Sequence, residues 1–377
     1  MAYDVSIVPC GDYSQENVRR ALGEAIEAVG GLDWVQPGMC IAVKANLVTL
    51  MRPEQAATTH PTPVAELCRM LTERGARVIV GDSPGGPWNG ANLKSVYAAS
   101  GMKAAESAGA ELNYDFSQRD AEFPEAVKAK SFPYTSWLDR ADAVIDFCKL
   151  KTHGLTAMSC AVKNFFGVIP GTKKPEFHYR YPKIGDFSDM LIDLTEYVRP
   201  RLTLVDAVLC MEGNGPTQGK PRHMGAIIAA ATPYSADLLC AGLIGLDGKV
   251  STVNAAIRRG LCPENIEDMS IYGQWRDFVI DDFDTLPPRD NITFGSHTVL
   301  VRQILERSFR AVPDVEKGKC VRCGKCREVC PMAAITIGEK QAEIDRKKCI
   351  RCFCCQEFCP VGAMKVRRTL LARLLTK

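Results

Sequence analysis

Hydrophobic positions in the first 300 residues alternate between short β-branched runs and longer stretches with helical spacing. The runs at 40–48 (CIAVKANLV) and 76–83 (ARVIVGDS) predict strands, and the stretch between them, at 61–75, predicts a helix. The alternation returns later in the chain, with strands predicted at 141–150, 201–211 and 225–232 and helices at 187–198 and 234–246. Because this alternation of strands and helices is typical of βαβ units, we expect an α/β fold with a mostly parallel sheet covered by helices.

No segment of the chain is predicted to cross a membrane. The longest apolar stretch, 224–246, is interrupted by Pro233 and Asp237 and fits a strand followed by a helix. The first residues lack the basic region and the apolar run of a secretory signal, so we expect a cytoplasmic protein. The 377 residues, 46% of them hydrophobic and 24% charged, have the composition of a globular protein with room for two or three domains.

Charge is unevenly distributed along the chain. The formal net charge of +3 gives no argument for a nucleic-acid partner. Residues 314–377, however, hold 15 basic and 7 acidic side chains, whereas the part before them has an acidic excess. We therefore expect two unlike parts to join near residue 313.

Nine of the 17 cysteines crowd into residues 320–359. The segment CVRCGKCREVCP at 320–331 recurs as CIRCFCCQEFCP at 349–360, with seven identities in twelve positions. Both copies match the bacterial ferredoxin run C-x2-C-x2-C-x3-C-P, in which the fourth cysteine of each run ligates the other cluster. The spacing therefore predicts two 4Fe–4S clusters. A pair of zinc knuckles is the alternative, although zinc sites rarely use this triple spacing.

The interleaved pattern assigns eight cysteines as cluster ligands. One cluster takes Cys320, Cys323, Cys326 and Cys359, and the other takes Cys349, Cys352, Cys355 and Cys330. Cys354 breaks the pattern and is interpreted as a structural thiol. Two adjacent one-electron centres form a path for electrons, so the chain is expected to act in electron transport, in an anaerobic host.

These patterns divide the chain into four parts. We expect an α/β domain at 1–300, a linker at 301–312, a small α+β bacterial-type ferredoxin domain at 313–366 and a basic amphipathic tail at 367–377. The tail is interpreted as a helix packed on the body. Docking of the tail to an acidic partner or a membrane surface is the alternative.

Polar residues follow several predicted strands, where α/β folds gather ligands. Lys44 and Asn46 end the first strand of the series, and Glu212 follows the strand at 201–211. Neither GDSPGG nor EGNGP matches a dinucleotide or phosphate-loop fingerprint, so no nicotinamide or ATP site is predicted. We expect these three side chains, together with His60 at the head of a predicted helix, to contact a small substrate.

The densest stretch of candidate chemistry is 149–178, directly after a buried-type strand. Lys151 and Asn164 are predicted to bind the substrate. His153, Lys163 and His178 could converge on it as acid, base, electrophile or ligand. The alternative is that the lysines are solvated and the histidines are ordinary core residues.

The ordered segments VKANLV, TTHPTP, GDSPGG, KLKTHGLTAMSCAVKNFFGVIPG and DAVLCMEGNGP resemble the domain-of-unknown-function family 362. The resemblance covers nearly the whole chain, in the architecture that carries a C-terminal double-cluster ferredoxin module. It implies a fold and iron–sulfur clusters but no substrate.

A fainter resemblance concerns His153, Lys163 and His178. Their segment is similar to the one in nickel-pincer lactate racemases that carries a catalytic histidine, the cofactor-tethering lysine and a nickel-binding histidine. The resemblance implies acid/base chemistry for His153, an anchor or electrophile at Lys163 and a metal or cofactor contact at His178. The glycine-rich sequence before that family's lysine is replaced here by Ser-Cys-Ala-Val at 159–162.

Three functions are compatible with these patterns. The first is an iron–sulfur oxidoreductase that passes electrons from a low-potential donor, ferredoxin-like or a reductase, through two clusters to a small anionic organic substrate. The second is a non-catalytic electron-transfer or cofactor-assembly protein, and the third is a racemase or epimerase. A flavin or a nickel cofactor stays open, because flavin sites lack one reliable motif.

Overall fold

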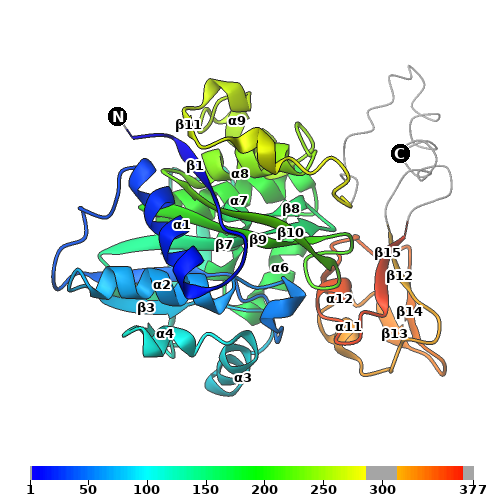
Figure 1. Ribbon diagram of the computed structural model, residues 1–377. Helices are drawn as coiled ribbons and strands as arrows, with labels where there is room; N and C mark the ends of the chain where they lie inside the picture. Colours follow the sequence, from blue (N-terminus) through cyan, green and yellow to red (C-terminus); the bar gives the residue numbers. More distant parts are fainter. Residues whose placement is uncertain (1, 286–311, 368–377) are drawn as a thin grey trace.

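The computed structural model describes residues 2–285 and 312–367. The larger part is an α/β domain built on a nine-stranded sheet, and a smaller unit at 312–367 lies against one side of it (Figure 1). The α/β fold expected from the sequence is confirmed. Most of the expected linker at 301–312 and of the tail at 367–377 lies outside the described residues.

The sheet is mixed but mainly parallel. Its order is β11-β1-β10-β9-β7-β2-β3-β4, with β8 paired to β7. The pairs β7–β9, β2–β7, β2–β3 and β3–β4 are parallel, whereas β10 runs antiparallel to both β1 and β9. The strands are β1 Val5–Pro9, β2 Cys40–Ala45, β3 Arg77–Gly81, β4 Glu111–Leu112, β7 Ala143–His153, β8 Ala157–Ser159, β9 Leu202–Glu212, β10 Lys220–Ala230 and β11 Ile271–Tyr272. A separate hairpin pairs β5 Gln118–Glu122 with β6 Ser131–Thr135.

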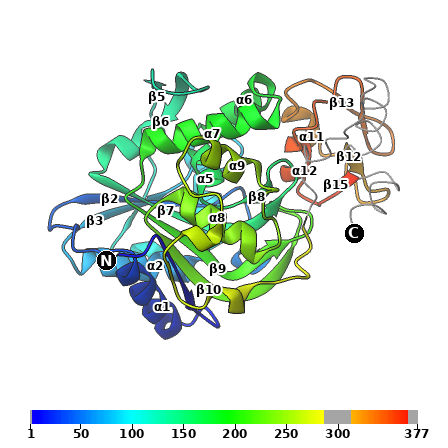
Figure 2. The same cartoon turned by 90° about the horizontal axis from the view of Figure 1, so that it is seen from above.

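Helices cover both faces of this sheet (Figure 2). On one face α1 packs against β1 and β10, and α2 packs against β2 and β3. On the other face α8 packs against β9 and β10, and α5 packs against β7. The helices are α1 Gln15–Ala28, α2 Pro61–Thr72, α3 Gly90–Ser100, α4 Ala104–Ser107, α5 Ala161–Asn164, α6 Lys174–Arg180, α7 Ile184–Val198, α8 Pro233–Leu243 and α9 Ser251–Arg258.

Helix α2 shows how the local sequence sets such an element. Pro61 occupies the first turn, where its missing N–H costs nothing, and the ring of His60 accepts a hydrogen bond from the backbone N–H of Thr62. The residues Val64, Leu67 and Leu71, at helical spacing, are fully buried. The helix ends at Thr72, three residues before the expected end, and a turn with a left-handed glycine follows.

The smaller unit consists of two two-stranded sheets and two short helices. It contains β12 Val312–Val315, α11 Lys325–Glu328, β13 Ile335–Ile337, β14 Ala342–Ile344, α12 Cys354–Glu357 and β15 Met364–Arg367. Strand β12 pairs with β15, and β13 pairs with β14. In Figure 1 helix α12 lies on the side of this unit that faces the α/β domain.

Hydrogen bonds join α12 to the hairpin between β9 and β10. The buried side chain of Gln356 donates from Nε2 to the carbonyl oxygens of Asn214 and Gly215, both at 3.0 Å. Thr217 donates to the carbonyl oxygen of Glu357 at 3.2 Å. Because α12 is the helix bonded in this way, the smaller unit presents a defined face to the α/β domain.

Candidate active site

A cavity lies where β2, β3 and β7 end, between the α/β domain and α12. Asn46 follows β2, Asp82 follows β3, and Lys151 and His153 end β7, and all four line the cavity. The carboxyl ends of neighbouring parallel strands meet at one edge of a sheet, which explains why these side chains gather there. The cavity has a volume of about 70 Å³ and is partly open to solvent.

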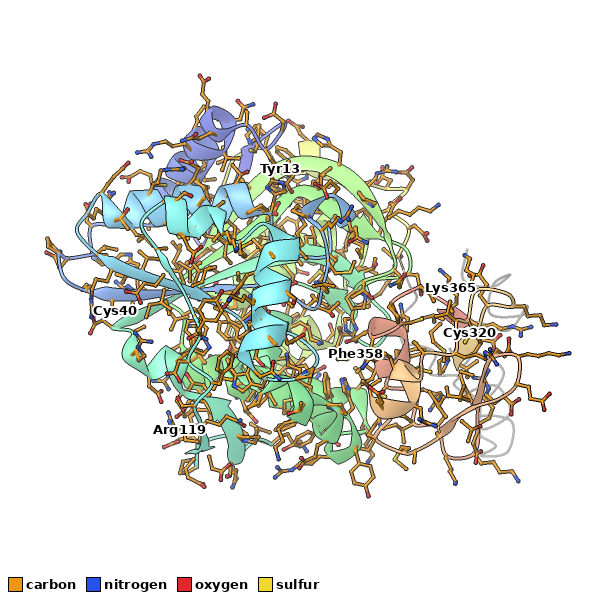
Figure 3. All side chains as sticks on the ribbon, turned by 90° about the horizontal axis from the view of Figure 1, so that it is seen from below. Tyr13, Cys40, Arg119, Cys320, Phe358 and Lys365 are labelled. Atoms are coloured by element: carbon orange, nitrogen blue, oxygen red, sulfur yellow. The ribbon has the colours of Figure 1, made fainter. Side chains whose placement is uncertain are left out.

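The opposite wall of the cavity comes from the ferredoxin unit. Cys354, Glu357 and Phe358 line it, and Figure 3 shows Phe358 at the junction of the two parts of the molecule. The Phe358 ring contacts Gly85 so closely that a side chain at that position would collide with it. The GDSPGG segment therefore uses glycine here for close approach, while the next residue, Gly86, has a left-handed backbone with φ of 107°.

His153 is held in one orientation at the end of β7. Its Nδ1 accepts hydrogen bonds from the backbone N–H groups of Leu155 at 3.0 Å and Thr156 at 3.3 Å. The neutral ring must therefore carry its proton on Nε2. That nitrogen lies 3.0 Å from Oε1 of Glu357 on α12.

Burial lowers the pKa of His153, so the ring is neutral at neutral pH. Burial alone would raise the pKa of Glu357, but His153 and Lys163 outweigh this effect and bring it to about 2. The pair is thus a neutral imidazole facing a carboxylate, and it links the two parts of the chain at the cavity.

Three lysines line the cavity. Lys151 donates to Asn46 Oδ1 at 2.5 Å and to a backbone carbonyl, and burial lowers its pKa to about 7. Lys163 lies 4.7 Å from the ring centroid of Phe166, and burial lowers its pKa. Lys174 donates to the carbonyl oxygen of Ser83, and burial lowers its pKa to about 8. The cavity is therefore electropositive.

A polar network behind the cavity fixes Asn164. The Asn164 amide nitrogen donates to the carboxylate of Asp146 at 2.6 Å and to the backbone carbonyl of Lys44 at 3.1 Å. Its oxygen accepts from Lys44 Nζ and from the Asn46 amide, both at 3.0 Å. Lys44 also forms a buried ion pair with Asp82 at 2.7 Å. These contacts set the positions of Asn46 and Asn164 at the wall.

His178 on α6 lines the cavity from an aromatic setting. Its ring stacks on Phe187 with a centroid distance of 4.7 Å and meets Phe166 edge to face. Both rings come from the helical segments beside the cavity, so His178 is oriented by packing.

The structure brings most of the predicted site residues together. The cavity is lined by His153, Lys163, His178, Asn46, Lys151 and Asn164. Lys44, His60 and Glu212 are not among its described lining residues. Lys44 stands behind the wall, as described above. Glu212 accepts a hydrogen bond from the backbone N–H of Asp284.

His60 belongs to a second buried cluster away from the cavity. Its ring stacks on Tyr13 with the centroids 3.6 Å apart, and its backbone N–H donates to Asp206. Asp206 also pairs with Lys149 at 2.8 Å. The hydrogen bonds and stacking hold His60 at the head of α2, where it caps the helix.

Lys174, Asp82, Cys354 and Glu357 also line the cavity, and the sequence analysis did not select them as site residues. Asp82 lies at the end of the strand predicted at 76–83, which is a usable signal. Glu357 lies inside the ferredoxin motif, where neighbouring cysteines dominate the pattern. Nothing in the local sequence indicates that α12 faces a cavity of another domain.

Two further cavities in the ferredoxin unit fit iron–sulfur clusters. One is lined by Cys320, Cys323, Cys326 and Cys359. The other is lined by Cys330, Cys349, Cys352 and Cys355. Each cavity is thus lined by one of the two interleaved sets of cysteines that the spacing predicts.

Backbone N–H groups donate hydrogen bonds to three of the predicted ligand cysteines. The N–H groups of Ala342, Ala334 and Ala363 donate to the sulfurs of Cys320, Cys330 and Cys359 at 3.4, 3.3 and 3.1 Å. Burial, with the nearby thiols of the same set, raises the pKa of Cys326. The residues present therefore fit the predicted clusters, and the number of clusters and their ligands stay predictions.

The fold and these cavities define an iron–sulfur protein that combines an α/β domain with a ferredoxin-type unit. The chain belongs to the family described as "Domain of unknown function (DUF362)", whose profile matches residues 41–242. A profile described as "4Fe-4S dicluster domain" matches residues 313–360. The family resemblance stated from the sequence is confirmed, as is the presence of an iron–sulfur domain.

One curated relative is a thylakoid-associated protein of Synechocystis sp. It is 29% identical over 307 residues, which cover 80% of this chain and 93% of the relative. No helix within the described residues is long and apolar enough to span a membrane.

Two solved structures are similar at a low level. The lactate racemase apoprotein of Thermoanaerobacterium thermosaccharolyticum has a TM-score of 0.42 at 12% identity, covering 63% of this chain and 56% of that one. A Thermotoga maritima protein has a TM-score of 0.36 at 12% identity, covering 57% of this chain and 55% of that one. This chain thus spans little more than half of either structure, and likeness at this level carries no argument about function.

Proposed function

We propose that this protein is an iron–sulfur oxidoreductase that reduces a small anionic organic substrate in the cavity between its two parts. The observation that carries the proposal is the shared wall. Cys354, Glu357 and Phe358 of the ferredoxin unit line the same cavity as Lys151 and Lys163 of the α/β domain. We interpret the ferredoxin unit as the source of electrons for the molecule that the cationic cavity binds.

The order of the cysteines supports a direction for the electrons. Two 4Fe–4S clusters, when bound, supply electrons one at a time at low potential. Cys352 and Cys355 flank Cys354 in sequence, so their set lies next to the cavity wall. Cys323 of the other set is exposed, and Figure 3 shows Cys320 farther from the α/β domain than Phe358. Electrons would enter near Cys323 and leave near Cys354.

Binding and protonation would fall to the lysines and His153. A two-electron reduction of a double bond takes up two electrons and two protons. Lys163 and Lys151 would hold the anion, and a pKa of about 7 suits Lys151 to give up a proton near neutral pH. Nε2 of His153, which carries the proton of the neutral ring, lies 3.0 Å from Oε1 of Glu357 at the interface.

The proposal includes a donor and a location. A low-potential donor protein, ferredoxin-like or a reductase, would refill the clusters. All 17 cysteines lie within the described residues and none forms a disulfide, which suits the reducing cytoplasm of an anaerobic host. Because the Synechocystis relative is described as thylakoid-associated, cell fractionation is the direct check of this location.

The test uses the full-length protein, purified without oxygen and reduced with dithionite that is then removed. Small unsaturated and keto acids are added one at a time, and reoxidation of the clusters is followed by visible absorbance. We expect at least one acid to restore the absorbance, and Lys163→Gln to slow this roughly tenfold. The exposed Lys94 provides the matched control Lys94→Gln, which should behave as wild type.

Clusters that stay reduced with every acid would refute the proposal. A Lys163→Gln variant that reoxidises as fast as wild type would refute the assigned role of that lysine. Reoxidation by a partner protein alone, without turnover of any acid, would instead support a non-catalytic electron-transfer protein.

A further inference from the structure

We propose that the cavity is built for a short dianion, of the size of a four-carbon dicarboxylate, whose two negative groups meet ammonium groups from separate segments of the chain. This inference deepens the proposed function and rests on it for the reaction. The binding itself does not depend on electron transfer.

The first argument is the balance of charge. Among the described residues, Lys151, Lys163 and Lys174 have no carboxylate within ion-pair distance, although all three line the cavity. Of the two carboxylates of the lining, Asp82 is paired with Lys44 at 2.7 Å, whereas Glu357 lies 3.0 Å from the neutral ring of His153. Glu357 therefore offsets one of the three ammonium charges, and up to two lack an anion, which exceeds what one monocarboxylate can neutralise.

The second argument is the placement of these cations. Lys163 and Lys174 come from the helical segment of α5 and α6, and both lie over the ring of Phe166, at 4.7 and 5.8 Å from its centroid. Lys151 comes from β7, where Asn46 Oδ1 holds its ammonium group. The cavity thus receives ammonium groups from separate segments of the chain. A ligand with a negative group at each end can contact ammonium groups of both segments at once.

The third argument is size. The cavity has a volume of about 70 Å³ and is partly open to solvent, so a compact acid fits with one end toward the opening. In a four-carbon unsaturated or keto diacid the reducible bond lies between the two carboxylates, within the same space. Its reduction would consume two electrons from the clusters, refilled by the low-potential donor, and two protons.

The titration of the lysines agrees with this arrangement. Burial lowers the pKa of Lys151 to about 7 and that of Lys174 to about 8, so the empty site is only partly protonated at pH 7.5. A bound dianion favours the charged ammonium forms and should draw protons from solution. The charged or titratable groups around these two lysines are Lys44, Asp82, Lys149, His153, Lys163, His178 and Glu357.

The experiment is calorimetric titration of the anaerobic holoprotein with two redox-inert probes, succinate and butyrate. Titrations at pH 7.5 in two buffers of different ionisation enthalpy measure proton uptake. We expect succinate to bind roughly 10- to 100-fold more tightly than butyrate, with net proton uptake. The affinity for succinate should fall as the pH rises above about 8, where the empty site holds fewer protons.

Variants of Lys163 test whether this lysine causes the preference for succinate over butyrate. Lys163→Gln should lose most of the preference for succinate, Lys163→Arg should restore it, and Lys94→Gln should keep it. An unchanged cluster absorbance spectrum shows that each variant is folded. Equal affinity for the two probes, binding of neither, or a full preference in Lys163→Gln would each overturn the dianion proposal.

The two proposals can fail separately. Succinate binding as described, with no acid able to reoxidise the clusters, refutes the reductase alone and upholds the dianion site. Reoxidation by an uncharged or singly charged compound, with no succinate binding, refutes the dianion site alone.

Discussion

Gln356 is the residue that we expect to control how firmly the ferredoxin unit closes the cavity. Its side chain is fully buried, and Nε2 donates to two carbonyl oxygens of the β9–β10 hairpin, those of Asn214 and Gly215, both at 3.0 Å. Gln356→Ala removes both hydrogen bonds and leaves two buried acceptors without a donor. Each bond contributes about 1 kcal/mol, so the interface should lose about 2 to 3 kcal/mol.

A loss of about 2 kcal/mol raises the population of the open interface roughly 30-fold. Hydrogen exchange of the anaerobic holoprotein, read by mass spectrometry, measures this directly. Exchange should accelerate in peptides that cover 212–218 and 353–358 and stay unchanged in α2. Cluster content should be unaffected, because Gln356 lines neither cysteine cavity.

Gln341→Ala is the matched control, since the side chain of Gln341 makes no hydrogen bond within residues 2–285 and 312–367. It should leave exchange at the interface as in wild type. If Gln356→Ala exchanges no faster than Gln341→Ala at 212–218, the reasoning that these two bonds hold the interface is wrong.

Three other predictions concern the clusters, the interface and one histidine. Cys323→Ser should lower the iron content by about half, whereas Cys354→Ser, outside both cysteine cavities, should keep it, as iron analysis will show. Gly85→Ala should push Phe358 away and accelerate exchange at 353–358. Burial lowers the pKa of His60 from 6.5 to about 4, so the unfolded chain binds a proton first as the pH falls. Urea unfolding should therefore show wild type losing more stability than His60→Asn between pH 6.5 and 4.

Much of the fold could be predicted from local patterns. The first six residues of the run CIAVKANLV form β2, and the helix expected at 187–198 is present as α7, extended to Ile184. The antiparallel placement of β10 between β1 and β9 could not be predicted. Its strand pattern is the same whichever neighbour it pairs with, and only long-range pairing decides its direction.

The site was predictable only in part, for the same reason. His153 and Lys151 follow the alternation of one strand, so their common face could be anticipated. Lys44 lies on the neighbouring strand β2 and is likewise a polar residue near the end of a predicted strand. Its ammonium group is bound by Asp82 and Asn164, and Lys44 is not among the described residues that line the cavity.

The cysteine sets illustrate what local spacing is enough to specify. Three thiolates within seven residues can reach one cluster without any information from the rest of the chain. The contact between His153 and Glu357 is of another kind, because 204 positions separate the two residues and only docking of α12 brings them to 3.0 Å. Ligand spacing is a property of a short backbone segment, whereas a shared cavity depends on the free energy of packing two folded units against each other.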